Sequence, residues 1–287
     1  MEDNKSNRAV IFYFSGTGNT WWVSEELAKA LTRDSQKVKA YSIEALTAHE
    51  ADQLIQHADL TGFGYPIHGS DIPLPMKRFI DQLPQVQNKS AFVFCTQWLW
   101  SGDGAAIGAA MLEEKGYSVY WGEHFYMPNN VSVSIIRLPY TNKPARLNSI
   151  LNRTGQKIKH FGNRIASGKT FRKGFNPIAR FMGSLQRRPY RHFYHKLQND
   201  IDVDRNICID CGECVRLCPV DNLYYDGSLI KTRGTCVICL RCYSFCPVAA
   251  ITYMGKAHLQ NRGEPYRGPI SNFDPGILIN QGEKKNS

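Results

Sequence analysis

Eight of the nine cysteines in this 287-residue chain form two runs whose spacing suits metal binding. The runs read CIDCGECVRLCP and CVICLRCYSFCP, so both follow the pattern C-x2-C-x2-C-x3-C-P. Soft thiolate ligands select zinc or iron–sulfur clusters. Paired C-x2-C arms are enough for zinc, which leaves the third cysteine and the C-P of each run without a purpose. The pattern therefore favours two [4Fe–4S] clusters.

In runs of this kind, the first three cysteines ligate one cluster and the fourth, which precedes a proline, ligates the other. The predicted ligands of the first cluster, called cluster I, are Cys208, Cys211, Cys214 and Cys246. The predicted ligands of the second, called cluster II, are Cys236, Cys239, Cys242 and Cys218. The ninth cysteine, Cys95, ends an apolar run and is predicted to be a small buried residue.

The segment 201–254, which contains both runs, resembles the bacterial-type two-cluster ferredoxins. The resemblance implies a small α+β domain in which each half supplies one run. Two features depart from the family pattern. CPVDNL follows the first run where these ferredoxins commonly carry CPxxAI, and Leu240 stands where the first half has Gly212. Neither position is a ligand, so we expect effects on cluster potential or packing only.

A second stretch, YFSGTGNT at 13–20, has the composition of a phosphate-binding loop. A nucleoside-triphosphate loop needs G-x-x-x-x-G-K-[ST], and this stretch has no lysine. A dinucleotide loop needs G-x-G-x-x-G, but Trp21 occupies the third glycine position, where an indole would block helix–strand packing. What remains is a turn of hydroxyls and backbone N–H groups at the start of a helix, which suits a single phosphate.

This loop resembles the phosphate loop of flavodoxins, which follows S/T-x-T-G-x-T and binds FMN without a cationic side chain. The resemblance implies that the phosphate is held by Ser15, Gly16, Thr17, Gly18, Asn19 and Thr20. A glycine-rich connector without a ligand is the alternative. Flavodoxins also place two further loops beside the flavin ring. The contacts implied here are Tyr65, Pro66, Ile67, His68 and Gly69 from one loop, and Thr96, Gln97, Trp98, Gly102, Asp103 and Gly104 from the other.

Flavodoxins commonly stack the flavin between aromatic side chains of these two loops. The candidates are Tyr65 or His68 on one side and Trp98 or Trp100 on the other, with ordinary packing as the alternative for each. His68 is either a proton donor to the reduced flavin or a plain surface histidine. Asp103 follows a Ser-Gly turn and is either a helix cap or a flavin contact.

Strand and helix patterns alternate in the part of the chain that must position these loops. Buried or half-buried strands are predicted at 9–14, 36–43, 58–65, 90–96 and 117–126. Helical patterns lie between them, and a final helix is expected near 145–166. The alternation predicts a parallel sheet with helices on both faces. With the phosphate loop, it indicates a flavodoxin-like α/β doubly wound fold.

The predicted organisation has four parts. An FMN-binding domain at 1–168 is followed by a basic linker at 169–200 that contains one short helix. The ferredoxin domain covers 201–254, and a tail at 255–287 is expected to be extended or partly disordered.

The net charge of +10 is concentrated in one segment. Residues 151–200 contain 12 Lys and Arg against one Asp, whereas the remainder is nearly neutral. No base-reading motif accompanies this charge, so nucleic acid is not an expected partner. The segment is predicted to be a strap between the domains or a docking site for an acidic redox partner. The polar N-terminus and the lack of a long apolar run predict a cytoplasmic protein without a transmembrane segment.

Taken together, the chain resembles the fused flavodoxin–ferredoxin proteins of anaerobic bacteria and archaea. The resemblance implies electron transport: a relay between FMN and two [4Fe–4S] clusters, and on to redox partner proteins that act as donor and acceptor. The alternative is an FMN-dependent reductase of a small organic acceptor, fed by its own ferredoxin domain. No acid–base pair and no pyridine-nucleotide motif are evident, so no catalytic residue is predicted and the carrier is favoured.

Overall fold

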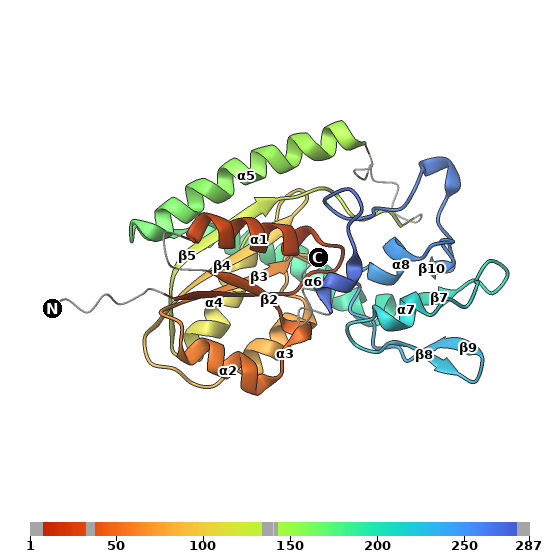
Figure 1. The fold of residues 1–287 in the computed structure, drawn as a ribbon, viewed down its shortest axis with the longest axis horizontal. Coiled ribbons are helices and arrows are strands. Elements are labelled where there is room, and N and C mark those ends of the chain that lie inside the picture. The colour runs from red at the N-terminus through yellow and green to blue at the C-terminus, as the bar shows by residue number, and fades with distance from the viewer. Residues whose placement is uncertain (1–7, 33–37, 134–139, 141–142, 280–287) are drawn as a thin grey trace, which may run out of the picture.

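A parallel sheet forms the centre of the N-terminal half of the computed structural model, which describes residues 8–32, 38–133, 140 and 143–279 (Figure 1). Its six strands are β1 (Ala9–Tyr13), β2 (Lys39–Ser42), β3 (Leu60–Pro66), β4 (Lys89–Gln97), β5 (Tyr117–Tyr126) and β6 (Phe171–Arg172). They lie in the order β2-β1-β3-β4-β5-β6, and every neighbouring pair is parallel. The order 2-1-3-4-5 is that of flavodoxin-like doubly wound sheets, so the predicted fold class is confirmed.

Five helices cover the two faces of this sheet. They are α1 (Asn19–Leu31), α2 (Ala48–Gln56), α3 (Leu74–Gln82), α4 (Gly104–Glu114) and α5 (Pro144–Ala166). In Figure 1, α1 and α5 lie on one side of the sheet and α2 and α3 on the other. Successive side chains of a strand point to opposite faces. In β1, Val10 and Phe12 therefore join the core under α2–α4, and Ile11 joins the core under α1 and α5.

The cysteine runs lie in a small α+β unit beside this sheet. Strand β7 (Ile201–Val203) pairs antiparallel with β10 (Ile251–Tyr253), and β8 (Leu223–Asp226) pairs with β9 (Leu229–Thr232). Two short helices, α7 (Glu213–Arg216) and α8 (Arg241–Phe245), each contain the third cysteine of a run. Cysteines of both runs belong to the core of this unit. A unit this small has little apolar surface to bury, so ligated clusters would supply much of its stability.

The segment 169–200 differs from its prediction as a linker with one short helix. It forms β6 and then the 23-residue helix α6 (Pro177–Asn199). The side chain of Asn176 caps the helix by accepting a hydrogen bond from the N–H of Ala179 at 2.8 Å. Pro189 lies inside the helix without ending it. Contacts with the flavodoxin-like domain hold α6 in place: Tyr190 packs on Gly69 and Gly183 on Asp103.

The C-terminal tail also differs from its prediction. Its described part contains the short 3-10 helices η2 (Gln260–Arg262) and η3 (Pro275–Leu278) and returns to the flavodoxin-like domain. The ring of Phe273 packs on Trp21 with centroids 5.1 Å apart. Ser42 Oγ donates a hydrogen bond to the carbonyl of Leu278 at 2.6 Å. Residues 280–287 of the predicted tail lie outside the described residues.

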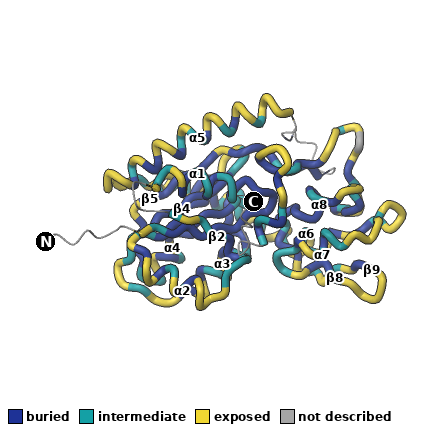
Figure 2. Tube along the Cα trace, in the orientation of Figure 1, coloured by how far each residue is buried: buried dark blue, intermediate teal, exposed yellow. Residues whose placement is uncertain are grey.

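Burial follows these layers. Figure 2 shows the sheet buried along its length, with exposed residues on the outer turns of α5 and in the β8–β9 hairpin. Within the described part of the chain, no helix combines the length and the apolar character needed to cross a membrane.

Candidate functional site

The structure gathers the eight cysteines into two groups of four. One cavity is lined by the cluster I cysteines, Cys208, Cys211, Cys214 and Cys246. A second cavity is lined by the cluster II cysteines, Cys218, Cys236, Cys239 and Cys242. In each group the fourth cysteine of one run joins the first three of the other. The fold therefore brings together the two sets that the spacing predicts, and cluster ligation itself stays a prediction.

The two runs share a left-handed backbone at matching positions. The φ angle is 52° at Asp210 and 55° at its counterpart Ile238, and it is 72° at Gly212 and 58° at Leu240. This conformation costs a non-glycine residue about 1 kcal/mol, which the surrounding structure must offset. The turn aims N–H groups at sulfur, since the N–H of Ile238 donates to Cys236 Sγ at 3.3 Å. Leu240 thus adopts the conformation of Gly212, and the departure leaves the turn unchanged.

The cluster II thiols are buried, so their thiolate forms need a positive charge beside them. Burial, and then the neighbouring Cys239, raise the pKa of Cys236 to about 12. Burial likewise raises the pKa of Cys242 well above its usual value. Thiolates so placed are stable only beside positive charge, which ligated iron supplies. Within the described residues, no three His, Cys, Asp or Glu are grouped tightly enough for a single metal ion, whereas a four-iron cluster is a larger body.

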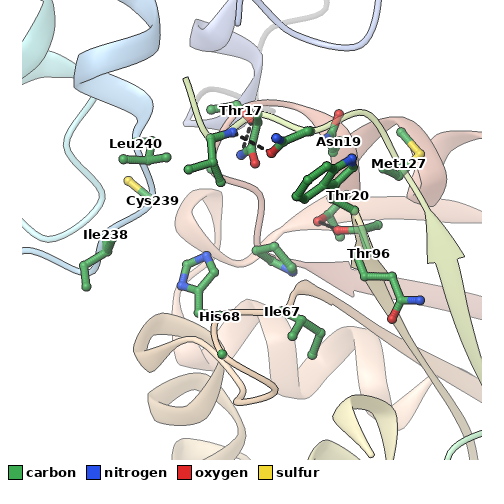
Figure 3. A pocket seen from close by; sticks show the side chains of 18 of the residues that line it. Thr17, Asn19, Thr20, Ile67, His68, Thr96, Met127, Ile238, Cys239 and Leu240 are labelled. Atoms are coloured by element: carbon green, nitrogen blue, oxygen red, sulfur yellow. Dashed lines mark hydrogen bonds between the residues drawn. The ribbon is translucent and has the colours of Figure 1, made fainter. Parts of the chain in front are cut away.

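A cavity of about 430 Å³ lies between the flavodoxin-like sheet and the cysteine unit. It is lined by parts of all three predicted FMN loops and by Ile238, Cys239 and Leu240. Figure 3 shows these three residues on one side of the cavity, with the phosphate loop and His68 opposite them. The phosphate-loop residues in the lining are Ser15, Gly16, Thr17, Asn19 and Thr20.

The phosphate end of the cavity is the start of α1. Gly18 has a φ of 94° and leads into the helix, which has no side-chain cap and no acidic residue in its first turn. The first amides of such a helix, together with its dipole, suit an anion. The four polar side chains of the loop already have partners. Ser15 Oγ accepts from the N–H of Gly18, and Thr17 Oγ1 accepts from Asn130. Asn19 Oδ1 accepts from Tyr266, and the hydroxyls of Thr20 and Thr96 bond to each other. The arrangement fits an FMN phosphate held mainly by backbone N–H groups.

The ring end also fits a flavin. Pro66, Ile67, His68 and Gly69 line it from one loop, and Thr96, Gln97, Trp98 and Trp100 line it from the other. The Oε1 atom of Gln97 is buried there without a hydrogen-bond donor among the described residues, so a ligand N–H would satisfy it. Burial lowers the pKa of His68 to about 4, so its ring is neutral near pH 7.

Five predicted contacts lie outside this cavity. Tyr65 belongs to the core, where its hydroxyl donates to the carbonyl of Gly104 at 2.8 Å, because its strand position points it under α4. Gly18 packs against Phe273 of the tail. The other three residues contact protein groups: Gly102 lies against α6, and Gly104 lies against the side chain of Ile67. Asp103 forms an ion pair with Arg187. Asp103 occupies the N-cap position of α4 but makes no side-chain cap bond.

Sequence reasoning missed several residues that line the cavity. The loop after β5 supplies Met127, Pro128, Asn129, Asn130, Val131 and Val133. Its place at the carboxyl end of the next parallel strand is a signal that could have revealed it. The other missed residues are Gln186, Tyr190 and Leu197 of α6 and Leu99, Ile238, Leu240 and Tyr253. No local pattern marks the residues of α6 and the cysteine unit, because they reach the cavity only through domain packing.

Two arginines attach α6 to the loops beside the cavity. Arg187 pairs with Asp103 through two bonds of 3.0 and 3.1 Å. Arg191 pairs with Asp71 through bonds of 2.6 and 3.1 Å. Arg172 and Lys173 likewise pair with Glu113 and Glu123. Four of the eight basic residues at 169–200 therefore pair with carboxylates of the flavodoxin-like domain.

Replacing Asp103 with alanine is expected to lower the free energy of unfolding by about 3 kcal/mol, because the charge of Arg187 then lacks its carboxylate partner at a largely buried position. The side chains of the pair are only 14% and 7% exposed. Chemical denaturation measures the loss. The matched control is Lys29→Ala, which removes an exposed pair with Glu26 and should change stability by less than about 0.5 kcal/mol. Equal losses in the two variants would contradict this role of Asp103.

A buried histidine anchors the second ring loop. The N–H of Ala105 donates to His124 Nε2 at 3.3 Å, so this nitrogen is unprotonated. The other ring nitrogen, Nδ1, then donates to Ser101 Oγ at 2.8 Å. Protonation of Nε2 would break the bond from Ala105. Burial, followed by the charges of Lys173 and Lys157, lowers the pKa of His124 to about 3.

The free energy of unfolding is therefore expected to fall as the pH drops from about 6.5 toward 3, because His124 is protonated over this range in the unfolded chain but not in the folded chain. Denaturation curves for wild type and His124→Gln at pH 7 and pH 5 measure this effect. The variant should lose less stability than wild type over this interval. The same loss in both proteins would rule out His124 as a source of the pH dependence.

Comparison with known proteins supports the assignment of the cysteine unit. Residues 201–224 match the family described as a 4Fe-4S binding domain. A probable ferredoxin of Thermoplasma acidophilum is 47% identical over 36 residues, which are 12% of this chain and 51% of that protein. This chain thus spans about half of the length of that relative. The C-terminal unit is a 4Fe–4S ferredoxin domain, and the chemistry of such clusters is electron transfer.

Solved flavodoxins align with the N-terminal half. An archaeal flavodoxin is 19% identical with a TM-score of 0.40, and the match covers 56% of this chain and 97% of that one. Oxidised flavodoxin 2 from Bacillus cereus is 18% identical with a TM-score of 0.42, covering 56% and 99%. Reduced Megasphaera elsdenii flavodoxin is 24% identical with a TM-score of 0.37, covering 43% and 90%. The flavodoxin-like assignment itself rests on the strand order. The chain therefore combines a flavodoxin-like domain with a 4Fe–4S ferredoxin domain.

Proposed function

We propose that this chain relays electrons between FMN in the cavity and two [4Fe–4S] clusters, and on to separate redox proteins. Bound FMN exchanges two electrons singly or together, and each four-iron cluster passes one, so the set can join one- and two-electron partners. The chain supplies the positions: the phosphate loop, the two ring loops and the two cysteine groups. Electron transfer is the chemistry of such domains, and the proposal adds the route from FMN through the two clusters to separate redox proteins.

The observation that carries the proposal is the shared wall of the two sites. Cys239, a cluster II cysteine, lines the FMN cavity. A Cβ atom on Gly16 of the phosphate loop would lie 2.4 Å from the carbonyl oxygen of Cys239, so the two backbones are in direct contact. Electrons therefore have a short path between the cavity and cluster II within one chain.

The cluster I group favours exchange with an outside protein. Cys211 is exposed, unlike the buried Cys236, Cys239 and Cys242 of cluster II. Ile209 and Val248 line the cavity of the cluster I cysteines, and their side chains are 60% and 37% exposed. Exposed apolar side chains around a redox group suit contact with a partner protein. We therefore assign cluster II to the flavin side and cluster I to the partner side.

An acidic redox protein is the partner that α6 would fit. Residues 177–199 contain no Asp or Glu, and their basic residues outside the pairs with Asp103 and Asp71 are Arg180, Arg188 and Lys196. The apolar side chains of Ile178, Phe181 and Leu185 are 76%, 63% and 51% exposed. Complementary charge accelerates docking, and salt screens this effect. Electron exchange with an acidic ferredoxin should consequently slow as the salt concentration rises, and a rate that did not depend on salt would oppose this docking.

The second candidate is a reductase of a small organic acceptor. A cavity of about 540 Å³ shares His68 and Tyr190 with the FMN cavity and could hold such a molecule. Mixing the reduced protein with a water-soluble quinone or with an oxidised ferredoxin separates the two functions. Rapid, saturable reduction of the quinone alone would favour the reductase, and rapid reduction of the ferredoxin alone would favour the relay.

Anaerobic purification tests the cofactor assignment. We expect about eight iron atoms, eight sulfides and one FMN per chain. Stepwise reduction, followed by optical and EPR spectra, should show flavin and clusters reduced in a linked sequence. Bound zinc, or clusters without FMN at saturating flavin, would contradict the proposed relay.

A further inference from the structure

The feature that carries the inference is Arg241, which lies between two cluster II cysteines, Cys239 and Cys242. Its side chain is 0% exposed and is the largest of the fully buried side chains in the described part of the chain. A buried guanidinium is destabilising unless its charge and its donors are matched. The hydrogen-bond partners of Arg241 therefore indicate its role.

All five N–H donors of Arg241 have acceptors, and these join distant segments. Nη1 and Nη2 donate to the carboxylate of Glu44 at 2.8 and 2.7 Å. Nη1 also donates to the carbonyl of Leu217, the residue before Cys218, at 3.0 Å. The remaining donors reach the phosphate loop: Nη2 to the carbonyl of Ser15 at 2.7 Å, and Nε to that of Gly16 at 3.2 Å.

These bonds orient the peptide groups that face the FMN phosphate. A trans peptide holds its N–H opposite to its C=O. Since the carbonyls of Ser15 and Gly16 point at the guanidinium, the N–H groups of Gly16 and Thr17 point away from it. Gly16 and Thr17 both line the cavity. The arginine thus presents backbone donors to the site where we expect the phosphate.

We propose that Arg241 is a positioning residue that couples cluster II to FMN binding. This inference rests on the proposed function, with FMN in the cavity and cluster II between its four cysteines. Ligation through Cys239 and Cys242 holds Arg241 on both sides, and Arg241 holds the phosphate loop. FMN then binds more tightly to the chain that carries cluster II than to the chain that lacks it. Because coupling between two sites is reciprocal, bound FMN also stabilises cluster II.

The test measures FMN affinity by flavin fluorescence in wild type and four variants whose iron content is determined. Cys236→Ser, which loses cluster II, should bind FMN at least about fivefold more weakly than wild type. Cys211→Ser, which loses cluster I instead, should weaken FMN binding less than Cys236→Ser does, because none of the four cluster I cysteines lines the FMN cavity. Arg241→Lys keeps the charge but lacks the planar five-donor fork. It should bind FMN more weakly although it still holds about eight iron atoms.

The double variant with both Arg241→Lys and Cys236→Ser completes the cycle. Loss of cluster II should have a smaller effect on FMN affinity in the Arg241→Lys background than in the wild-type background. Equal affinity in wild type and Cys236→Ser would overturn the coupling, and an equal loss in both backgrounds would overturn the role of Arg241. If iron-loaded wild type bound no FMN, the proposed function itself would fail.

Discussion

Replacing Cys236 with serine is expected to remove cluster II alone and to lower the iron content from about eight to about four atoms per chain. A hydroxyl is a harder and poorer ligand than a thiolate for this kind of iron site. With FMN supplied at saturation, electrons delivered to cluster I should no longer reach the flavin at the wild-type rate. Stopped-flow absorbance of the flavin, after mixing with a reduced ferredoxin, measures this step.

Cys95→Ser is the matched control for that variant. Cys95 is buried in the flavodoxin-like core, with its sulfur 3.8 Å from Ser101 Oγ, and it belongs to neither cysteine group. Iron content and flavin reduction should therefore stay at wild-type values. A Cys236→Ser protein that retained about eight iron atoms, or that reduced its flavin at the wild-type rate, would refute the route through cluster II.

A single methyl group at Gly16 is expected to have the next largest effect. The Cβ of Gly16→Ala would lie 2.4 Å from the carbonyl oxygen of Cys239, so the phosphate loop and the cluster II run must move apart. Because both segments line the FMN cavity, we expect FMN affinity to fall at least about tenfold, which corresponds to about 1.4 kcal/mol. Fluorescence titration with FMN measures this loss, and flavin reduction should slow with it.

Gly155→Ala provides the comparison, since it adds the same methyl group elsewhere. A Cβ on Gly155 would lie 3.9 Å from the indole of Trp22, an ordinary contact, and alanine favours the helix more than glycine does. FMN affinity should stay unchanged and stability should hold or rise. Wild-type FMN binding by Gly16→Ala would show that the two backbones are not in contact in solution.

The closure of the cavity depends on segments that look like connectors in the sequence. Helix α6 places Gln186 and Tyr190 in its wall. The C-terminal tail brings Tyr266 to Asn19 of the phosphate loop, where its hydroxyl donates at 2.6 Å. Flavin binding in this chain should therefore require residues beyond the flavodoxin-like domain, unlike in a domain that binds its cofactor alone.

Local sequence patterns predicted the strands and the cysteine groups, because both depend on residues close together in the chain. The strands at 117–126 and 90–96 correspond to β5 and β4 with at most one residue of difference at either end, because both contain a continuous buried run, as parallel strands covered on both faces do. Within the strand expected at 36–43, Lys39–Ser42 form β2, and Ile43 begins a short 3-10 helix. The two cysteine groups followed from spacing, since three cysteines so close in the chain can reach one cluster only in a few ways.

Two predictions were wrong because contacts between distant parts of the chain, which local patterns do not record, decided the structure. Only one short helix was predicted in the linker at 169–200, but the pairs made by Arg187 and Arg191 hold the long helix α6, which contains Pro189, on the flavodoxin-like domain. Tyr65 was a candidate for stacking because flavodoxins commonly stack the flavin on an aromatic side chain of this loop, but the direction of its side chain is set by the strand face, which buries it under α4.

The sequence by itself predicted the cofactor chemistry proposed for this chain, from two four-cysteine groups, a loop suited to a phosphate and a parallel sheet that carries it. Only the tertiary structure decided how these sites relate. The bonds from Arg241 to Ser15 and Glu44 join residues far apart in the chain. Such contacts depend on how completed elements pack, and neither periodicity nor motif spacing records them. The shared wall of the flavin cavity and the cluster II group, on which the proposed relay depends, is a product of that packing.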